Sequence, residues 1–263
     1  MTLRLGIAIA ALAAAGATDG APVWWQRVSE ALGLRSAQAD AIAPIEVFDP
    51  GGKATEWIAG LGLTARQWDG IERAALLVIG EDALSSADPM PGDIEKFVAL
   101  GGKVLILPQD PIWLAEFVGL QPSPQPCLRC GPGDPEQAVA RGLPSDALGG
   151  WPSPMAKAPI RLPDRGGWRS LLDAIGQPGH TILMEADYGW GRITICAIDF
   201  ESSANRPPAM ALAQRVIAHA GRVTQLAAPV WREDREANRR LFHPSPPDAA
   251  GGEGFYRKAG AVP

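Results

Sequence analysis

The sequence predicts an α/β domain built on a mostly parallel sheet with helices on both faces. Two stretches, residues 75–80 and 103–107, are apolar without the polar alternation of a half-exposed strand, as expected of parallel strands covered on both sides. Helical patterns precede and separate these stretches. The resulting order of strand, helix, strand, helix, strand is typical of right-handed βαβ crossovers.

The composition is that of a folded domain. The chain has 263 residues, of which 46% are hydrophobic and 20% charged, so it is long and apolar enough to bury a full core. Its formal net charge of -5 offers no general attraction to nucleic-acid phosphates or to anionic lipids. Beyond the N-terminus, no run of about 18 strongly apolar residues occurs. We therefore expect neither nucleic acid nor a membrane as a partner.

The N-terminal segment, residues 1–43, has two interpretations. Its basic start, its apolar run and the small residues Ala15, Gly16 and Ala17 are typical of a signal peptide. The same region alternates in the manner of a half-buried strand, and a helix that begins near Pro22 follows. The protein is exported if residues 1–17 are a signal peptide and cytoplasmic otherwise, and the sequence leaves both open.

The main domain is expected over residues 44–228, and its elements follow in order. The first strand leads through the turn Pro50-Gly51-Gly52 into the first helix. Glycines follow the first two helices, where they adopt the backbone conformations that close a helix. The expected strands cover residues 44–49, 75–80 and 103–107, and the expected helices cover 53–61, 91–100 and 208–220.

Two segments depart from this pattern. Residues 121–163 are rich in Pro and Gly and poor in periodic apolar positions, so we expect a long irregular insertion that is functional or packed at an interface. Residues 229–263 are charged and then rich in Pro and Gly, and we expect a polar tail there.

A β-hairpin is expected near the end of the domain. The strand-like runs 181–186 and 192–198 flank Asp187-Tyr188-Gly189-Trp190-Gly191, in which glycine supplies the positive-φ positions of a tight turn. This turn is no phosphate cradle, because the chain has neither a GxGxxG nor a GxxxxGKS/T motif. We therefore expect no nucleotide cofactor.

The cysteines do not form a recognisable metal site. Cys127 and Cys130 form a single CxxC, and Cys196 lies in an apolar run. A tetrahedral zinc site needs four ligands, whereas the histidines at positions 180, 219 and 243 are scattered singly. We expect no metal and no cofactor. The CxxC is interpreted as a loop pair, reduced or joined as a small disulfide, with redox or metal chemistry as the alternative.

Several of these segments together resemble a known family. The strand and turn at residues 44–53, "ALLVIGEDAL", "FVALGGKVLIL", "GWRSLLDAIG" and "ILMEADYGWGRITICAIDF" resemble the class I glutamine-amidotransferase-like domains of bacterial glycoside hydrolases of the β-galactosidase and β-mannosidase kind. The resemblance covers about residues 44–222 and implies a flavodoxin-like or Rossmann-like sheet between helices. It also implies a role in assembly, or in shaping the edge of a neighbouring catalytic domain.

The residues that an amidotransferase needs are missing. Its nucleophilic Cys lies at the sharp turn after the strand that corresponds to residues 103–107, where the start of a helix stabilises the thiolate. This sequence has Pro108-Gln109-Asp110-Pro111 at that turn, and no His-x-Glu pair occurs late in the chain. We therefore predict a non-catalytic domain without glutaminase activity and assign no catalytic residue.

Polar residues at the ends of the expected strands form a candidate ligand site, because open α/β sheets bind ligands at the carboxyl edge. Asp110 before Pro111 is also typical of a helix N-cap. Paired acids suit glycoside hydrolysis only at a set separation, which the sequence does not give. The candidates are Glu81, Gln109, Asp110, Asp199 and Glu201.

Tryptophan is unusually frequent, with nine residues against two tyrosines. Its flat amphipathic ring stacks on sugars, and Trp151, Trp168 and Trp190 fall in or near expected loops. We take these three as candidates for a carbohydrate-facing surface, with core packing or a domain interface as the alternative.

Two functions follow from the sequence. The first is an accessory or assembly domain of a carbohydrate-active enzyme, whose partner is a catalytic domain or a second copy of the chain, with an apolar patch that includes part of residues 121–163. The second is a small glycoside hydrolase or sugar-binding protein, which requires a pocket with converging acids and exposed tryptophan.

Overall fold

The computed structural model describes residues 44–70, 76–85, 90–133, 139–143, 147–203, 206–222 and 237–243. The chain divides into two compact units, Met1–Ala41 and Ile42–Pro263, and the described residues all belong to the second. The expected signal peptide or strand at the N-terminus lies outside the described residues, as do residues 244–263.

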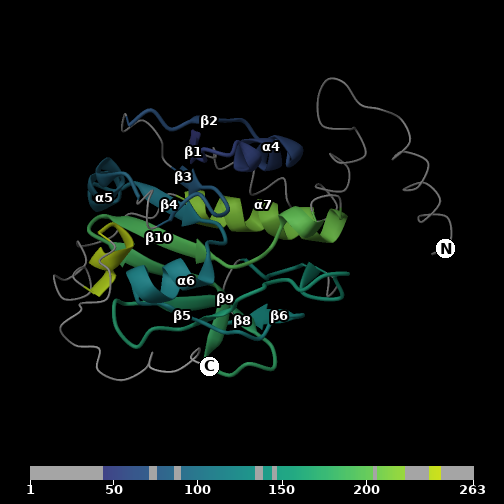
Figure 1. The fold of residues 1–263 in the computed structure, drawn as a ribbon. Coiled ribbons are helices and arrows are strands. Elements are labelled where there is room, and N and C mark those ends of the chain that lie inside the picture. The colour runs from purple at the N-terminus through teal and green to yellow at the C-terminus, as the bar shows by residue number, and fades with distance from the viewer. Residues whose placement is uncertain are drawn as a thin grey trace, which may run out of the picture. The chain divides into compact units, whose positions relative to one another are not determined.

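A mixed sheet of ten strands runs through the described part of the chain (Figure 1). Its strands are β1 (Ile45–Phe48), β2 (Ala65–Gln67), β3 (Leu76–Ile79), β4 (Lys103–Ile106), β5 (Gln121–Pro122), β6 (Cys130–Pro132), β7 (Ile160–Arg161), β8 (Arg169–Ala174), β9 (His180–Tyr188) and β10 (Gly191–Cys196). The order is β2-β1-β3-β4-β10-β9-β7-β5, with β8 also paired to β9 and β6 paired to β8.

The two halves of this sheet differ in strand direction. From β2 to β10 each strand is parallel to its neighbour, whereas every pairing of β9, β7, β5, β8 and β6 is antiparallel. The prediction of an α/β class is therefore confirmed, and the prediction of a mostly parallel sheet is wrong. Of the antiparallel half, only the β9–β10 hairpin was predicted; β5, β6 and β7 have two or three residues each, too few to show a period.

The two predicted central strands are confirmed as β3 and β4, and their side chains are buried on both faces of the sheet. All four residues of β3 and all four of β4 are buried. Burial on both sides explains why these segments show no polar alternation. The edge strand β2 carries Ala65, Arg66 and Gln67 and is mostly exposed, so it gave no apolar signal in the sequence.

The described helices are α4 (Lys53–Gly60), α5 (Gly92–Ala99), α6 (Pro111–Trp113), the π-helical turn η1 (Leu114–Val118), α7 (Pro207–Gly221) and the 3-10 turns η3 (Glu201–Ser203) and η4 (Arg239–Leu241). Of these, α4, α5 and α7 match the helices predicted at residues 53–61, 91–100 and 208–220. Among the described residues, no helix combines the length and the hydropathy that a membrane span requires.

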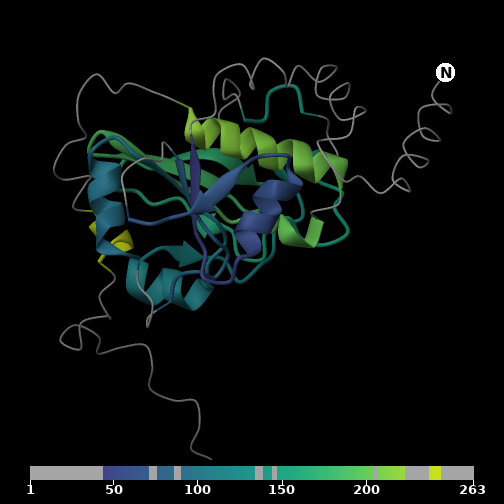
Figure 2. The same ribbon diagram turned by 90° about the horizontal axis from the view of Figure 1, so that it is seen from above.

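Helices α5 and α7 cover opposite faces of the sheet. Glu185 and Tyr188 are three residues apart on β9, so their side chains point to opposite faces. Glu185 contacts His219 of α7, whereas Tyr188 donates a hydrogen bond to Glu95 of α5. Helix α4 lies beside α7 (Figure 2), where the Gln214 side chain donates to the Leu61 carbonyl at 3.0 Å.

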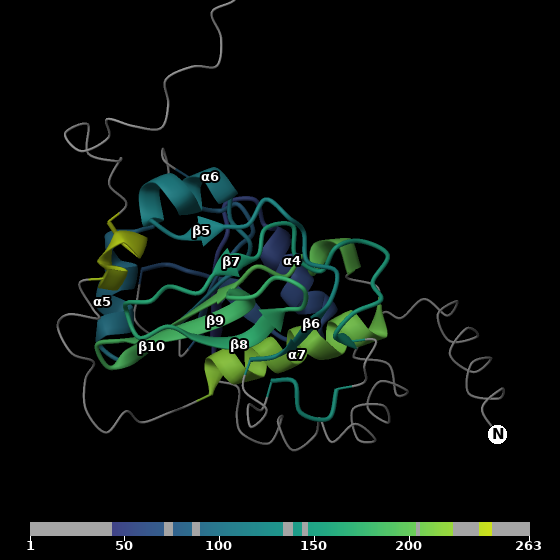
Figure 3. The ribbon, with the colours of Figure 1, turned by 90° about the horizontal axis from the view of Figure 1, so that it is seen from below.

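The insertion at residues 121–163 is less irregular than predicted. It supplies β5, β6 and β7 to the antiparallel half, and β5 lies beside α6 and η1 (Figure 3). Its connecting segments also pair with neighbours, as in the isolated bridges of Cys127 with Ala156 and of Arg129 with Gly149. These pairings give hydrogen-bond partners to backbone N–H and C=O groups, which in an irregular loop would bond to water.

The predicted hairpin is confirmed as β9 and β10. Gly189 has a φ of 61°, and the Trp190 N–H donates to the Ala99 carbonyl at 3.1 Å. A Cβ atom on Gly191 would lie 2.1 Å from the Gly102 carbonyl oxygen and 2.2 Å from that of Val98. Only glycine therefore fits where the hairpin turn crosses the end of α5.

A group of charges around the buried Glu185 joins β8, β9 and β10 to α7. Glu185 is 3% exposed and contacts Arg169 at 2.6 Å, His219 at 2.9 Å and Arg192 at 3.6 Å. Asp187 receives a second bond from Arg192 at 2.8 Å. Burial raises the pKa of Glu185, but the hydrogen bond and charge of His219, with Arg192 and Arg169, lower it to about 2.

Residues 237–243, predicted to belong to the polar tail, pack on the α/β domain. Leu241 and Phe242 are 2% and 3% exposed, and the Phe242 ring lies 4.9 Å from that of Tyr188. Two apolar residues among charged neighbours are too few to predict such packing from the sequence.

Replacing Gly191 with Ala should destabilise the domain by about 1–3 kcal/mol, because the clashing atoms belong to the backbone and cannot rotate away. Thermal unfolding measures the effect. Gly60→Ala is the matched control: a Cβ there meets nothing within 4 Å, and alanine should stabilise α4 by about 0.5–1 kcal/mol. Equal melting temperatures for the two variants would contradict this account of the turn.

Replacing Glu185 with Gln should lower the free energy of unfolding near neutral pH by about 1–3 kcal/mol, since Arg169, Arg192 and His219 share this buried carboxylate and the two arginines keep only Asp187. A carboxyl group whose pKa is lowered on folding stabilises the fold above its unfolded pKa. The difference from the parent should therefore shrink as the pH falls from about 4.3 toward 2. Urea unfolding at several pH values measures it, and Glu116→Gln, at an exposed acid, is the control. A pH-independent difference would count against the ionic origin.

Candidate functional site

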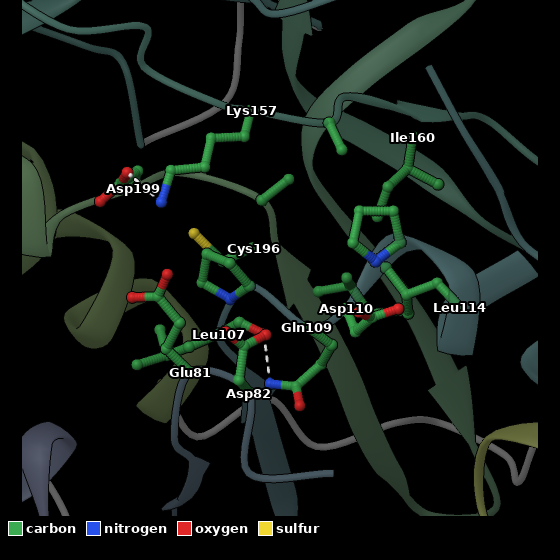
Figure 4. A pocket seen from close by; sticks show the side chains of 15 residues that line it. Glu81, Asp82, Leu107, Gln109, Asp110, Leu114, Lys157, Ile160, Cys196 and Asp199 are labelled. Carbon is green, nitrogen blue, oxygen red and sulfur yellow. Dashed lines mark hydrogen bonds and ion pairs between the residues drawn. The ribbon is translucent and has the colours of Figure 1, made fainter. Parts of the chain in front are cut away.

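A pocket of about 160 Å³ lies at the carboxyl edge of the parallel half (Figure 4). The segments that follow β3, β4 and β10 converge there, and the insertion closes the pocket with residues 157–160. Four of the five predicted ligand residues line it: Glu81, Gln109, Asp110 and Asp199. The fifth, Glu201, begins η3 two residues after Asp199.

Gln109 holds the two loops of the site together. It is 6% exposed, and its amide nitrogen donates to the carbonyls of Gly80 at 2.7 Å and Leu107 at 2.8 Å. Its amide oxygen accepts from the Leu84 N–H at 3.0 Å. Both ends of the amide therefore bond to backbone, and this residue acts as a clamp between the loops after β3 and β4.

Asp110 caps the helix that follows. Its carboxylate accepts from the N–H groups of Ile112 at 2.7 Å and Trp113 at 2.9 Å, and Pro111 occupies the first helical position. This is the N-cap arrangement that the sequence suggested as the alternative to ligand binding. One oxygen of Asp110 accepts both bonds, so the carboxylate serves the fold even though it borders the pocket.

Lys157 and Asp199 form an ion pair at the pocket, 3.0 Å apart. Asp199 is 3% exposed and also accepts from the N–H and the hydroxyl of Ser202. Burial raises the pKa of Asp199, but the Ser202 bonds and the Lys157 charge outweigh it and hold the pKa below its usual value. Asp199 is therefore an ionised acceptor at neutral pH.

Two further acids surround the Lys157 ammonium. The hydrogen bond and charge of Asp199 raise the pKa of Lys157 most, and the charges of Glu81 and Asp82 add to this effect. Figure 4 shows the Lys157 side chain extended toward Asp199, with Glu81 on the same side of the pocket. Asp82 has a φ of 50°, and its N–H bonds to the Pro108 carbonyl at 2.9 Å.

The sequence analysis missed Lys157 and Cys196 as lining residues. Lys157 lies in the insertion, where no period indicated which residues would face the sheet. Cys196 ends β10, so its place at the carboxyl edge could have been inferred from the predicted hairpin. Burial and the charge of Glu81 raise the pKa of the Cys196 thiol to about 12, which makes it a poor nucleophile at neutral pH.

All three cysteines are free thiols and buried. Burial raises the pKa of Cys130 to about 12, and its neighbours Cys127 and Cys196 contribute in the same direction. The Cys127 thiol donates to the Arg129 carbonyl at 2.9 Å. Among the described residues, no three His, Cys, Asp or Glu side chains are grouped so that they could hold a metal ion.

The three candidate tryptophans have different surroundings. Trp151 is 8% exposed and packs against Phe200 at 6.2 Å between ring centroids, so it has no free face for a sugar. Trp168 is half-buried at the edge of a different groove, beside β8. Trp190 is 49% exposed at the tip of the hairpin. The structure therefore brings none of them to the carboxyl-edge pocket.

The described lining residues of this pocket do not form a nucleophile and base. No histidine is among them, and its thiol is protonated. Acyl transfer of the amidotransferase kind needs an activated nucleophile within reach of a base.

The comparisons with known proteins assign no family to the chain. No family model matches it, and no curated protein matches it. Among solved structures it is similar to the exo-beta-1,4-mannosidase Op5Man5 from Opitutaceae bacterium strain TAV5, with 13% sequence identity and a TM-score of 0.42. The match covers 76% of this chain and 40% of that one.

That structural neighbour is distant, and it is a glycoside hydrolase. Neither its identity nor its TM-score is high enough to transfer an activity to this chain. The resemblance to amidotransferase-like domains finds no support in a family match.

Replacing Asp199 with Asn should lower the pKa of Lys157 toward that of an ordinary lysine, because the main partner of the ammonium loses its charge. Labelling with an amine-selective reagent at several pH values, followed by peptide mass spectrometry, measures this pKa. Asp110→Ala is the control, since Asp110 lines the same pocket without raising the pKa of Lys157. An unchanged Lys157 profile in the Asp199 variant would show that the ion pair does not form in solution.

Proposed function

We propose that this chain is a non-catalytic amidotransferase-like domain that serves as an accessory or assembly domain beside a carbohydrate-active catalytic domain. One observation carries the proposal. At the turn after β4, where an amidotransferase places its nucleophile, Gln109 has its amide engaged in three backbone hydrogen bonds.

The neighbouring groups do not replace the missing nucleophile. The Cys196 thiol is fully buried, and its pKa is raised to about 12. A catalytic thiol requires the opposite environment, in which positive charge or a helix start lowers the pKa. The pocket thus lies at the edge where open α/β sheets bind ligands, but it lacks the activated nucleophile that acyl transfer requires.

An exposed apolar pair supports a role in protein contact. Leu128 of the insertion is 63% exposed, and Ile175, which follows β8, is 54% exposed. They lie on adjacent segments, since the Ile175 N–H donates to the Arg129 carbonyl at 3.0 Å. Large apolar side chains left in water favour burial against a partner. The proposed partner is a catalytic domain or a second copy of the chain.

The second candidate is a small glycoside hydrolase or a sugar-binding protein that uses the carboxyl-edge acids. It is favoured by the convergence of Glu81, Asp82, Asp110 and Asp199 on one pocket. Hydrolysis requires a carboxylic acid whose pKa is raised enough to donate a proton. Asp199 has a lowered pKa and Asp110 caps a helix, so this candidate ranks second.

One preparation tests both candidates. We expect no turnover of glutamine or of a panel of chromogenic glycosides, together with a light-scattering mass above that of the monomer. Replacing Leu128 and Ile175 with Ser should reduce that mass to the monomer value, whereas Leu100→Ser, at another exposed apolar residue, should not.

Turnover would contradict the proposal if it is lost in Asp110→Asn or Glu201→Gln, and it would make the chain an enzyme. A monomer without turnover would exclude self-association and leave a separate catalytic chain as the partner.

A further inference from the structure

A second groove of about 730 Å³ lies in the antiparallel half, between the segment that follows β7 and the strand β8. Its volume falls within the range of roughly 300–1,000 Å³ that is typical of ligand pockets. It shares no lining residue with the carboxyl-edge pocket. Its lining includes residues of β8, the turn between β8 and β9, and His180 at the start of β9.

The Trp168 ring at the edge of this groove is held in one orientation. Its indole N–H donates to the Asn238 side chain at 2.7 Å, and the Asn238 amide donates to the Gly166 carbonyl at 2.8 Å. Asn238 is 4% exposed, and a Cβ on Gly166 would lie 2.3 Å from its amide oxygen. The indole N–H is therefore satisfied within the protein, and the half-buried ring adds apolar surface to the lining of the groove.

Polar side chains that accept hydrogen bonds line the same groove. Asp173 is exposed, and the Ser170 hydroxyl donates to one of its two carboxylate oxygens. The His180 Nδ1 lies 3.2 Å from the Pro178 carbonyl, which can only accept, so Nδ1 carries the proton in the neutral ring. The Nε2 of that ring is then an acceptor for a hydroxyl group.

The charges of the groove favour a neutral ligand. Arg169 lies 2.6 Å from Glu185 and 3.5 Å from Asp187, so two carboxylates compensate its charge. Asp173 adds a negative charge at the surface. A phosphate or a sugar acid would meet a compensated cation and an extra carboxylate, whereas a neutral polyol can donate to the carboxylate and the imidazole.

The strand pairing argues against an extended peptide as the ligand. Peptides that bind to a sheet usually extend it along a free strand edge. β8 already pairs with β6 on one side and β9 on the other. The groove therefore offers a ring face and side-chain acceptors, and no backbone ladder along β8.

From these observations we infer that the groove between the segment after β7 and β8 is a binding site for a neutral saccharide. The sugar stacks one apolar face on Trp168 and donates hydroxyl hydrogen bonds to Asp173 and His180. Asn238 is a positioning residue, because it orients the Trp168 ring without touching the ligand. The inference goes beyond the proposed function, since an accessory domain needs no saccharide site of its own.

Isothermal titration calorimetry with cellobiose, mannobiose and lactose, and with digalacturonate as the anionic comparison, tests this site. At least one neutral disaccharide should bind, and digalacturonate should bind more weakly. Trp168→Ala should weaken binding by about tenfold or more, and Trp168→Phe should retain most of it. Trp190→Ala is the matched control, because it removes an exposed tryptophan from the hairpin tip and should leave binding unchanged.

Two further variants keep the test clear of folding defects. Asp173→Ala changes an exposed residue and should also weaken binding, with an unchanged circular dichroism spectrum. Asn238→Ala should weaken binding and broaden the NMR resonance of the Trp168 indole N–H. The broadening is expected only if Asn238 holds the Trp168 ring in place. Failure of all three neutral disaccharides to bind, tighter binding of digalacturonate, or equal affinity of the Trp168→Ala variant would overturn the inference.

The outcome is separable from that of the proposed function. Binding without hydrolysis supports both proposals. Absence of binding overturns the saccharide site alone, and hydrolysis of a bound disaccharide overturns the non-catalytic role alone.

Discussion

The parallel pairing of β10 with β4 joins the two halves of this sheet, and the rest of the structure depends on it. β10 is parallel to β4 on one side and antiparallel to β9 on the other. The turn that precedes it crosses α5 so closely that Gly191 has no room for a side chain. A shift of one residue in this register would exchange the faces of every side chain on β10. It would carry Arg192 away from Glu185.

The carboxyl-edge pocket follows from this arrangement. β3, β4 and β10 end at the same edge because they run in the same direction, and the acids that follow them are brought together there. Repulsion among these acids is offset by Lys157, which the insertion places beside Asp199. Gln109 and Asp110 stabilise the loops themselves. The edge thus combines structural hydrogen bonds with a small polar pocket.

The antiparallel half contains the second groove. The network around Glu185 fixes Arg169 at the start of β8, and Asn238, from a segment far along the chain, fixes Trp168 next to it. Two distant parts of the sequence therefore determine the orientation of one ring. An aromatic ring that is held in this way loses little conformational freedom when a ligand binds, which favours recognition.

The sequence by itself determined the α/β class, the strands β1, β3 and β4, the long helices and the β9–β10 hairpin. These elements have strong local signals: the uninterrupted apolar run at Leu76–Ile79, and the glycines on both sides of Trp190. It also determined which acids follow the parallel strands, because that depends on chain order alone.

The tertiary structure decided the rest. The antiparallel half extends beyond the β9–β10 hairpin through β8 and through the strands β5, β6 and β7, which have only two or three residues each. The burial of Trp151, the half-exposure of Trp168 and the approach of Lys157 to Asp199 depend on contacts between residues far apart in sequence. A local sequence pattern shows which residues share one face of a helix or strand. It does not show which distant segment will cover that face, and this is why Lys157 and the groove beside β8 could not be derived from the sequence.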